Sequence, residues 1–91
     1  MNKSELIEEL AERTGYSPKL TDKTVRIFFD RIKYALKVND KVEIRGFGSF
    51  NLKKYKGYTG RNPKTGVTVE VKQKQLPVFR TGKDLRSRVN N

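Results

Sequence analysis

The sequence has 91 residues with no cysteine and no histidine, which suffices for one small domain without disulfides or the usual transition-metal ligands. Its 21 basic and 10 acidic residues give a formal net charge of +11, so a polyanion such as nucleic acid is the expected partner. Scarce carboxylates and the lack of a long apolar run argue against an enzyme, a bound cofactor or metal, and a membrane-spanning protein.

The positive charge is concentrated in the second half of the chain. Residues 1–40 carry a net charge of +1, whereas residues 41–91 carry +10. An evenly solvated surface does not produce this asymmetry, so the second half is predicted to face a polyanion. A solubilising surface and an anionic membrane are the alternatives to nucleic acid.

The first segment predicts a short helix. Asn2 and Glu5 have the spacing of a capping box, and Gly15 is expected to end the helix in the left-handed conformation. One apolar stripe is expected on this helix, formed by Leu6, Ile7, Leu10 and Ala11.

A second, longer helix is predicted to follow. Ser17 is its expected N-cap and Pro18 occupies the first helical position. The helix is expected to end near Val38, because Asn39-Asp40 is typical of a turn. Its buried stripe is predicted to contain Val25, Phe28, Phe29, Ile32 and Leu36.

From residue 41 the hydrophobic period changes from that of a helix to two. Val42 and Ile44 alternate with polar residues, which predicts a strand. The segment Gly46-Phe47-Gly48 predicts a tight reversal in which the glycines permit positive φ. A second strand is expected to continue from Phe50, and Phe47, Phe50 and Phe79 are predicted to pack in a core rather than stack on bases.

Residues 53–74 form the most basic part of the chain and contain one acid, Glu70. Because few of their side chains could anchor them to a core, we expect a hairpin that leaves the body after Leu52 and returns near Leu76. The alternative is a disordered basic loop that becomes ordered on binding DNA. The basic side chains are Lys53, Lys54, Lys56, Arg61, Lys64, Lys72 and Lys74.

The chain is predicted to close with an edge strand and a short helix. Pro77 fits only an edge strand, because it cannot donate to a ladder. Thr81 and Asp84 have the spacing of a helix cap. Lys83 and Arg86 then lie near the start of the helix, where cations and free N–H groups suit a phosphate.

Three motifs together resemble the bacterial HU/integration host factor family of histone-like DNA-bending proteins. They are GFGSF at 46–50, GRNPKTG at 60–66 and LPVFRTGKDLR at 76–86, and the resemblance covers essentially the whole chain. It implies an α+β fold in an intertwined two-fold dimer. Each subunit has two N-terminal helices, a three-stranded antiparallel sheet extended into a β-arm, and a short C-terminal helix.

The resemblance also implies the domain organisation. Residues 1–91 form one DNA-binding domain, with a helical dimerisation region at 1–40 and a sheet at 41–80. The β-arm spans about 53–74, and the C-terminal helix spans 81–91. The implied dimer core comprises Phe28, Phe29, Ile32, Phe47, Phe50 and Phe79.

The function implied is that of a nucleoid-associated architectural protein in the cytoplasm, with no catalysis, cofactor or membrane. It binds duplex DNA through the minor groove, bends it by intercalating Pro63, and compacts it with little sequence specificity. Bent, nicked or gapped DNA is the preferred partner, because it costs less to kink. The implied DNA-contacting residues are Arg45, Lys53, Lys54, Lys56, Arg61, Asn62, Pro63, Lys64, Lys72, Lys74, Lys83 and Arg86.

Two alternatives remain open. Residues 43–50 look closer to an integration host factor subunit, in which an arginine at the position of Arg45 takes part in site-preferred binding. The first alternative is therefore a site-preferring DNA bender that acts in a heterodimer with a paralogous subunit. We favour the HU-like role of a homodimer, because the chain ends at Asn91 without the longer tail of many integration host factor subunits. The other alternative is a structural RNA-binding protein, although the shallow minor groove of A-form RNA offers a wedge little purchase.

Overall fold

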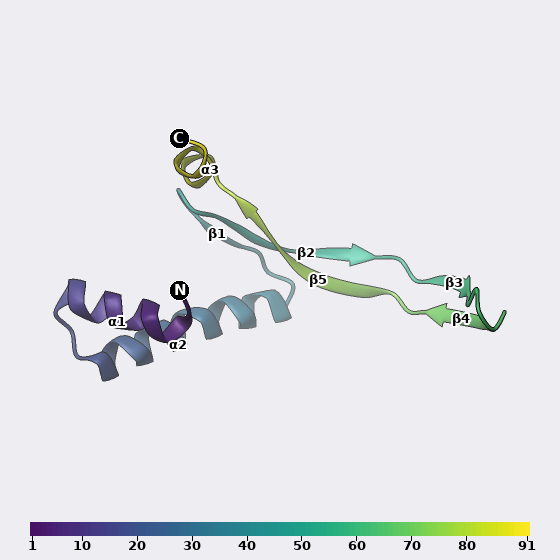
Figure 1. The fold of residues 1–91 in the computed structure, drawn as a ribbon, viewed down its shortest axis with the longest axis horizontal. Helices are drawn as coiled ribbons and strands as arrows, with labels where there is room; N and C mark the ends of the chain where they lie inside the picture. Colours follow the sequence, from purple (N-terminus) through teal and green to yellow (C-terminus); the bar gives the residue numbers. More distant parts are fainter. The chain divides into compact units, whose positions relative to one another are not determined.

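The computed structural model describes residues 1–91, which fall into two compact units, 1–35 and 36–91. The elements follow the predicted α+β order (Figure 1). No helix is both long and apolar enough to cross a membrane. The elements are α1 (Lys3–Thr14), α2 (Pro18–Lys37), β1 (Val42–Ile44), β2 (Gly48–Tyr55), β3 (Tyr58–Arg61), β4 (Thr68–Val71), β5 (Lys74–Thr81) and α3 (Lys83–Val89).

Helix α1 has the cap that its sequence predicts. The Asn2 side chain accepts a hydrogen bond from the Glu5 backbone N–H at 2.9 Å, and the Asn2 N–H donates to the Glu5 carboxylate at 3.4 Å. Gly15 ends the helix with φ +77° and donates to the Ala11 carbonyl. These local bonds satisfy backbone groups that a helix end would otherwise leave without partners, so the predicted boundaries of α1 are confirmed.

Helix α2 also begins as expected. The Ser17 hydroxyl accepts from the Leu20 N–H at 3.1 Å, and Pro18 is the first helical residue. The helix ends at Lys37, one residue before the predicted limit, and Asn39 then adopts φ +63°. Asparagine tolerates this left-handed conformation better than most residues, which explains why the helix stops here.

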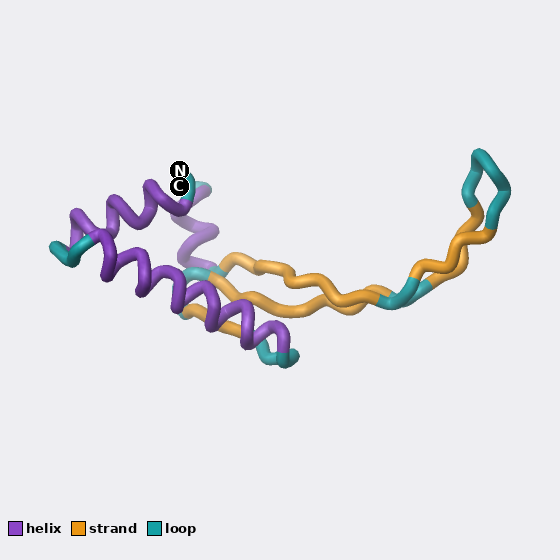
Figure 2. Tube along the Cα trace, turned by 90° about the horizontal axis from the view of Figure 1, so that it is seen from below, coloured by secondary structure: helices purple, strands orange, loops and turns teal.

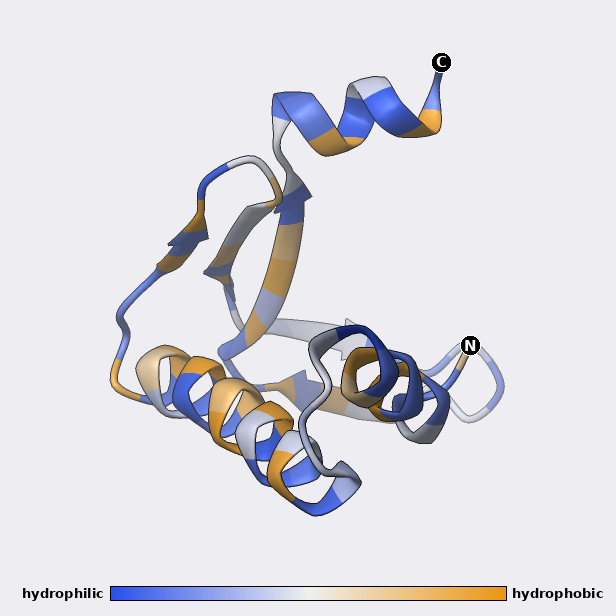
Figure 3. Ribbon diagram, turned by 90° about the vertical axis from the view of Figure 1, so that its left-hand side faces the viewer, coloured by the Kyte–Doolittle hydropathy of each residue, from blue (hydrophilic) through white to orange (hydrophobic).

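The single chain buries very little apolar surface. Its buried side chains are those of Ile7, Ala11, Thr21, Val25 and Ile32, Gly48 is one further buried residue, and no side chain is fully enclosed. Apolar segments nevertheless recur along α2 (Figure 3). Phe28 and Phe29 pack edge to face with ring centroids 5.3 Å apart, yet they remain 50% and 39% exposed.

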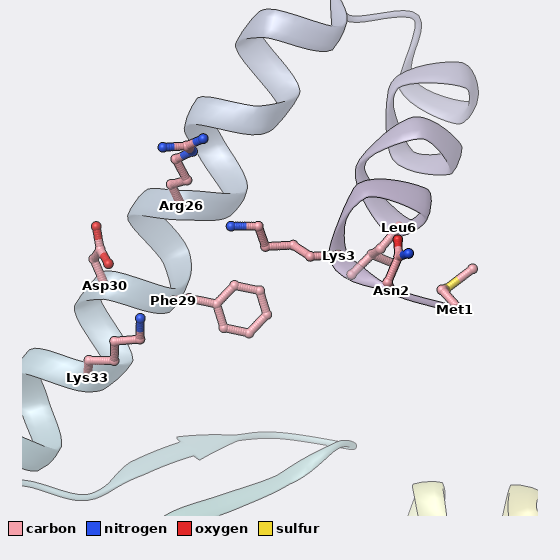
Figure 4. A pocket seen from close by; sticks show the side chains of 8 residues that line it. All are labelled: Met1, Asn2, Lys3, Leu6, Arg26, Phe29, Asp30 and Lys33. Carbon is pink, nitrogen blue, oxygen red and sulfur yellow. The ribbon is translucent and has the colours of Figure 1, made fainter.

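A hollow of about 530 Å³ lies beside Phe29 within the first unit. The Phe29 ring projects from α2 toward Leu6 and Met1 at the start of α1 (Figure 4). Around these apolar groups stand the charged side chains of Lys3, Arg26, Asp30 and Lys33. The first unit by itself therefore does not fill the space beside Phe29.

The second unit is built on a three-stranded antiparallel sheet in the order β1-β2-β5. Phe50 on β2 lies opposite both Val42 on β1 and Phe79 on β5. Because side chains alternate along a strand, these residues share one face of the sheet. Pro77 occupies β5, which pairs only with β2, so the predicted edge strand is confirmed.

The turn between β1 and β2 uses its two glycines in different ways. Gly46 has φ +85°, as predicted, but Gly48 does not have a positive φ. Gly48 is buried instead: a Cβ there would lie 2.5 Å from the Arg80 carbonyl oxygen and 2.6 Å from the Phe79 ring. The expectation of positive φ is thus wrong for Gly48, which is required for close packing rather than for turn geometry.

Three phenylalanines pack on one another above Gly48. The Phe79 ring lies 5.2 Å from that of Phe47 and 4.9 Å from that of Phe50, measured between centroids. Phe47 and Phe79 are still 45% and 42% exposed. The cluster is therefore formed within one chain, yet two of its three rings remain partly exposed.

The predicted cap of the last helix is wrong. Gly82, not Thr81, is the N-cap of α3, and no side chain caps the helix. Thr81 is held as the last residue of β5, opposite Gly48. The Gly82 N–H donates to the Phe47 carbonyl at 2.8 Å, so contact between the turn and the helix start sets this boundary in place of a local cap.

We predict that Gly48→Ala destabilises the protein by roughly 1–3 kcal/mol, because the added methyl overpacks against backbone and a ring. The measurement is the free energy of unfolding in urea. Gly60→Ala is the matched control, since a Cβ there meets only the Tyr58 ring at 3.5 Å. Equal stability of the two variants would contradict the close-packing role of Gly48.

Candidate nucleic-acid interface

The basic stretch forms a long two-stranded arm. Strands β2 and β5 pair from Gly48–Thr81 out to Tyr55–Lys74, and β3 and β4 continue the hairpin from Tyr58–Val71 to Arg61–Thr68. Figure 2 shows this arm as paired strands that end in a loop. The predicted hairpin is confirmed, and its first part is formed by β2 and β5, which are also strands of the sheet.

The arm contains a joint between its two paired segments. Two residues on each side of the arm are not part of any strand: Lys56 and Gly57 between β2 and β3, and Lys72 and Gln73 between β4 and β5. No backbone hydrogen bond joins the two pairs. Each strand advances by three residues across the interruption, so no residue is inserted and the register is kept. A Cβ on Gly57 would come within 2.7 Å of the Val71 carbonyl oxygen, which shows that the strands stay close.

The tip of the arm is shaped by Asn62. Its N–H donates to the Val67 carbonyl at 2.9 Å, its carbonyl accepts from Gly66 at 2.7 Å, and its side-chain oxygen accepts from the Lys64 N–H at 2.9 Å. Gly66 adopts φ +72°. Pro63 lies within this turn and is exposed. Asn62 is thus a structural residue of the tip, a role that the sequence analysis did not assign.

The cations of the arm have no carboxylate partners. The two ion pairs of the chain are Arg26–Asp22 at 3.0 Å and Arg88–Asp84 at 3.1 Å, each within a helix. Glu70 lies opposite Thr59. All twelve residues expected to contact DNA are exposed, and the seven basic residues of 53–74 remain available to a polyanion.

A second basic group lies at the other end of the same unit. Arg45 is in the turn between β1 and β2, and Lys83 and Arg86 are on α3. The hydrogen bond between Gly82 and the Phe47 carbonyl holds the turn beside the helix start. Figure 1 shows this end of the sheet far from β3 and β4. The structure thus divides the expected interface into an arm group and a body group.

Tyr55 is a further residue of the arm, which the sequence analysis did not include among the DNA-contacting residues. The Lys53 Nζ lies 5.5 Å from the centre of its ring, and the Lys74 Nζ lies 6.0 Å from it. The i, i+2 spacing of Lys53 and Tyr55 on a strand signals a shared face, but the pairing with Lys74 depends on the register.

No group of histidine, cysteine, aspartate or glutamate side chains is placed to hold a metal ion.

The chain combines a helix pair that has exposed apolar side chains with a sheet that extends into a cationic arm. These features define a class of small basic proteins that bind a polyanion. The sequence model of the family described as "Bacterial DNA-binding protein" matches residues 1–90. The chain belongs to this family.

Relatives and solved structures agree with this assignment. The chain is 48% identical to integration host factor subunit beta of Pseudoalteromonas translucida (strain TAC 125), over 99% of this chain and 96% of the relative. The same subunit of Vibrio parahaemolyticus serotype O3:K6 is also 48% identical, over 99% of this chain and 98% of the relative. The fold is similar to that of HU in the Anabaena HU–DNA cocrystal structure, with a TM-score of 0.87 and 37% identity over 98% and 97% of the two chains. The fold is also similar to that of HU from Thermotoga maritima, with a TM-score of 0.69 and 29% sequence identity over 98% of each chain.

We predict that Asn62→Ala disorders the tip without unfolding the body, because the lost acceptor and carboxamide serve the loop alone. Amide hydrogen exchange should become faster at Lys64 and Gly66, while the free energy of unfolding changes by less than about 0.5 kcal/mol. Asn62→Asp keeps the acceptor oxygen and should retain the protection. Unchanged exchange in Asn62→Ala would show that the side chain does not shape the tip.

Proposed function

We propose that this protein is an architectural DNA-binding protein of the bacterial nucleoid, acting in the cytoplasm, which bends and compacts duplex DNA with little sequence preference. The observation that carries the proposal is the long, exposed arm whose cations have no carboxylate partners. Membership of a DNA-binding family and the likeness to an HU that was crystallised with DNA support it. No catalytic step enters this function.

Affinity comes from phosphate neutralisation. Lysines and arginines that meet phosphates release condensed counterions, so log affinity falls by about 0.9 per log salt for each contact. The arm supplies Lys53, Lys54, Lys56, Lys72 and Lys74 for this purpose. The body supplies Arg45, Lys83 and Arg86 where the DNA continues past the sheet.

Bending is assigned to the tip. Pro63 is rigid, apolar and without an N–H, so it can cover exposed base faces without leaving a donor unsatisfied. Arg61, Asn62 and Lys64 flank it and would lie in or beside the minor groove. Unstacking a base step costs a few kcal/mol, which the added wrapped contacts must offset. Bent, nicked or gapped DNA is therefore the favoured partner, and A-form RNA is disfavoured.

A dimer follows from the uncovered apolar surface. Phe28 and Phe29 in one unit, and Phe47 and Phe79 in the other, are each well over a third exposed. With Phe50 they form the proposed dimer core, whereas Ile32 is already buried within one chain. A closed two-fold pairing would cover this surface and give the assembly two arms.

We therefore predict that the protein sediments as a dimer at micromolar concentration and that unfolding and dissociation coincide, because the monomer core is too small to stand alone. Analytical ultracentrifugation together with concentration-dependent thermal unfolding measures this. A folded monomer at that concentration would rule out the pairing.

For the proline wedge, we predict that Pro63→Ala keeps linear-duplex affinity within about threefold, because phosphate contacts supply most of it. The same variant should reduce bending and the preference for nicked DNA, and Pro63→Asp should reduce both further. Energy transfer between dyes at the ends of a short duplex reports the bend. If Pro63→Ala bends the duplex as fully as the parent protein, Pro63 is only a turn residue.

A second candidate function is favoured by the curated relatives above, which are named integration host factor subunit beta. In this alternative the chain is a site-preferring DNA bender and pairs with a paralogous subunit. Arg45 is exposed in a turn held against α3, which suits a residue that reads the groove beside the body. This alternative fits the comparisons at least as well as the weakly selective role.

We predict that, if Arg45 supplies site preference, Arg45→Ala flattens affinity differences among DNA sequences by roughly tenfold, the value of one good base contact, and leaves generic binding largely intact. Binding-site selection with the purified homodimer, with and without the substitution, measures this. A parent homodimer that enriches no sequence would restrict site preference to a heterodimer or exclude it.

A further inference from the structure

A tyrosine and two lysines form a small cluster at the base of the arm. The ammonium nitrogens of Lys53 and Lys74 lie 5.5 Å and 6.0 Å from the centre of the Tyr55 ring. Both distances are within the range in which a cation is attracted to the face of an aromatic ring. Tyr55 thus contacts two cations at once.

Strand register explains how the cluster arises. Tyr55 and Lys74 are direct cross-strand partners, and Lys53 precedes Tyr55 by two residues on the same strand. All three side chains therefore stand on one face of the β2–β5 ladder. This pair is the last before the joint at Lys56–Gly57, so the cluster belongs to the paired segment that is continuous with the sheet.

The ring offsets the conformational entropy that the two lysines lose when their side chains are fixed. Each long lysine side chain loses rotamer freedom when it is held in one position. The electron-rich face of the tyrosine attracts both cations and restricts their positions before any ligand is present. The N–H donors directed away from the ring remain free, and Tyr55 itself is 37% exposed.

We propose that Tyr55 is a positioning residue: its ring holds the Lys53 and Lys74 ammonium groups in place to bind the phosphates of the DNA backbone at the base of the arm. This inference rests on the proposed function, since DNA is the phosphate source it invokes. Tyr55 acts through the two lysines and carries no charge of its own. Pre-ordering reduces the entropy that each lysine loses when it binds a phosphate.

Three full-length variants test the proposal. Tyr55→Leu removes the ring but keeps apolar bulk, and Tyr55→Phe keeps the ring and removes the hydroxyl. Tyr34→Leu is the matched control: Tyr34 is an exposed tyrosine on α2, with the Arg31 guanidinium 5.4 Å from its ring centre, outside the proposed interface. Affinity for a short unmodified duplex is measured by fluorescence anisotropy over a series of salt concentrations.

We expect Tyr55→Leu to weaken binding roughly three- to tenfold at every salt concentration, the size that one or two exposed cation–π contacts supply. The slope of log affinity against log salt should not change, because no charge is lost. Lys74→Gln, in contrast, should lower that slope by about 0.9 for each phosphate contact removed. Tyr55→Phe should bind as the parent does, and so should Tyr34→Leu.

A second measurement examines the cluster without DNA. Protons beside an ammonium that sits over a ring are shifted upfield in NMR spectra, so the ε-methylene signals of Lys53 and Lys74 should be shifted in the parent and in Tyr55→Phe. They should return to ordinary values in Tyr55→Leu. The loss of affinity should also vanish when Tyr55→Leu is introduced into a protein that already carries Lys53→Gln and Lys74→Gln.

Each contrary result overturns the proposal. An unchanged affinity in Tyr55→Leu shows that the ring does not position the lysines, and a reduced salt slope shows that the arm base has lost its structure instead. A loss that persists in the Lys53→Gln, Lys74→Gln background shows that Tyr55 contacts DNA itself. If the parent protein does not bind the duplex in a salt-dependent way, the proposed function fails together with this inference.

Discussion

Apart from Gly48, the chain by itself buries only four apolar side chains and one threonine. Ordering the backbone costs about 1–2 kcal/mol per residue, and so small a core cannot offset that cost over 91 residues. Phe29 and Phe79 stay partly exposed, and in the proposed dimer a second chain covers them. Under the proposed pairing, the same contact that stabilises the fold also gives the DNA two arms instead of one.

The arm can be almost free of apolar anchors because it is an extension of the sheet. Its first pairs belong to the ladder between β2 and β5, and Phe50 and Phe79 tie the start of that ladder to the aromatic cluster. The end of the hairpin that lies in the sheet therefore supplies its stability, and the basic side chains lie along the rest of it. This separation lets the sequence of the outer arm serve the ligand without weakening the core.

Much of the fold could be predicted from the sequence where short-range chemistry decides it. The caps at Asn2 and Ser17 use partners within three residues, and the change of hydrophobic period marks the sheet. The cap of α3 was predicted incorrectly because the Gly82 contact with Phe47 comes from the tertiary structure. The packing role of Gly48 was missed for the same reason, since the Phe79 ring that it faces lies far along the chain.

The interface was predictable in its composition but not in its geometry. Charge and spacing located the basic hairpin, and every expected contact residue is exposed. The cluster around Tyr55 depends on which residue lies opposite on β5, and sequence periodicity does not supply that register. The tip bonds of Asn62 similarly require the loop geometry.

The joint in the arm has a mechanical consequence. A ladder that lacks hydrogen bonds over two residue pairs resists bending less than the paired segments on either side, so compliance is concentrated at Gly57. Because the register is kept, a bend at this joint would turn the outer segment without changing which of its side chains share a face. Under the proposed function, the base of the arm would keep its phosphate contacts while the tip adjusts to double helices of unequal curvature.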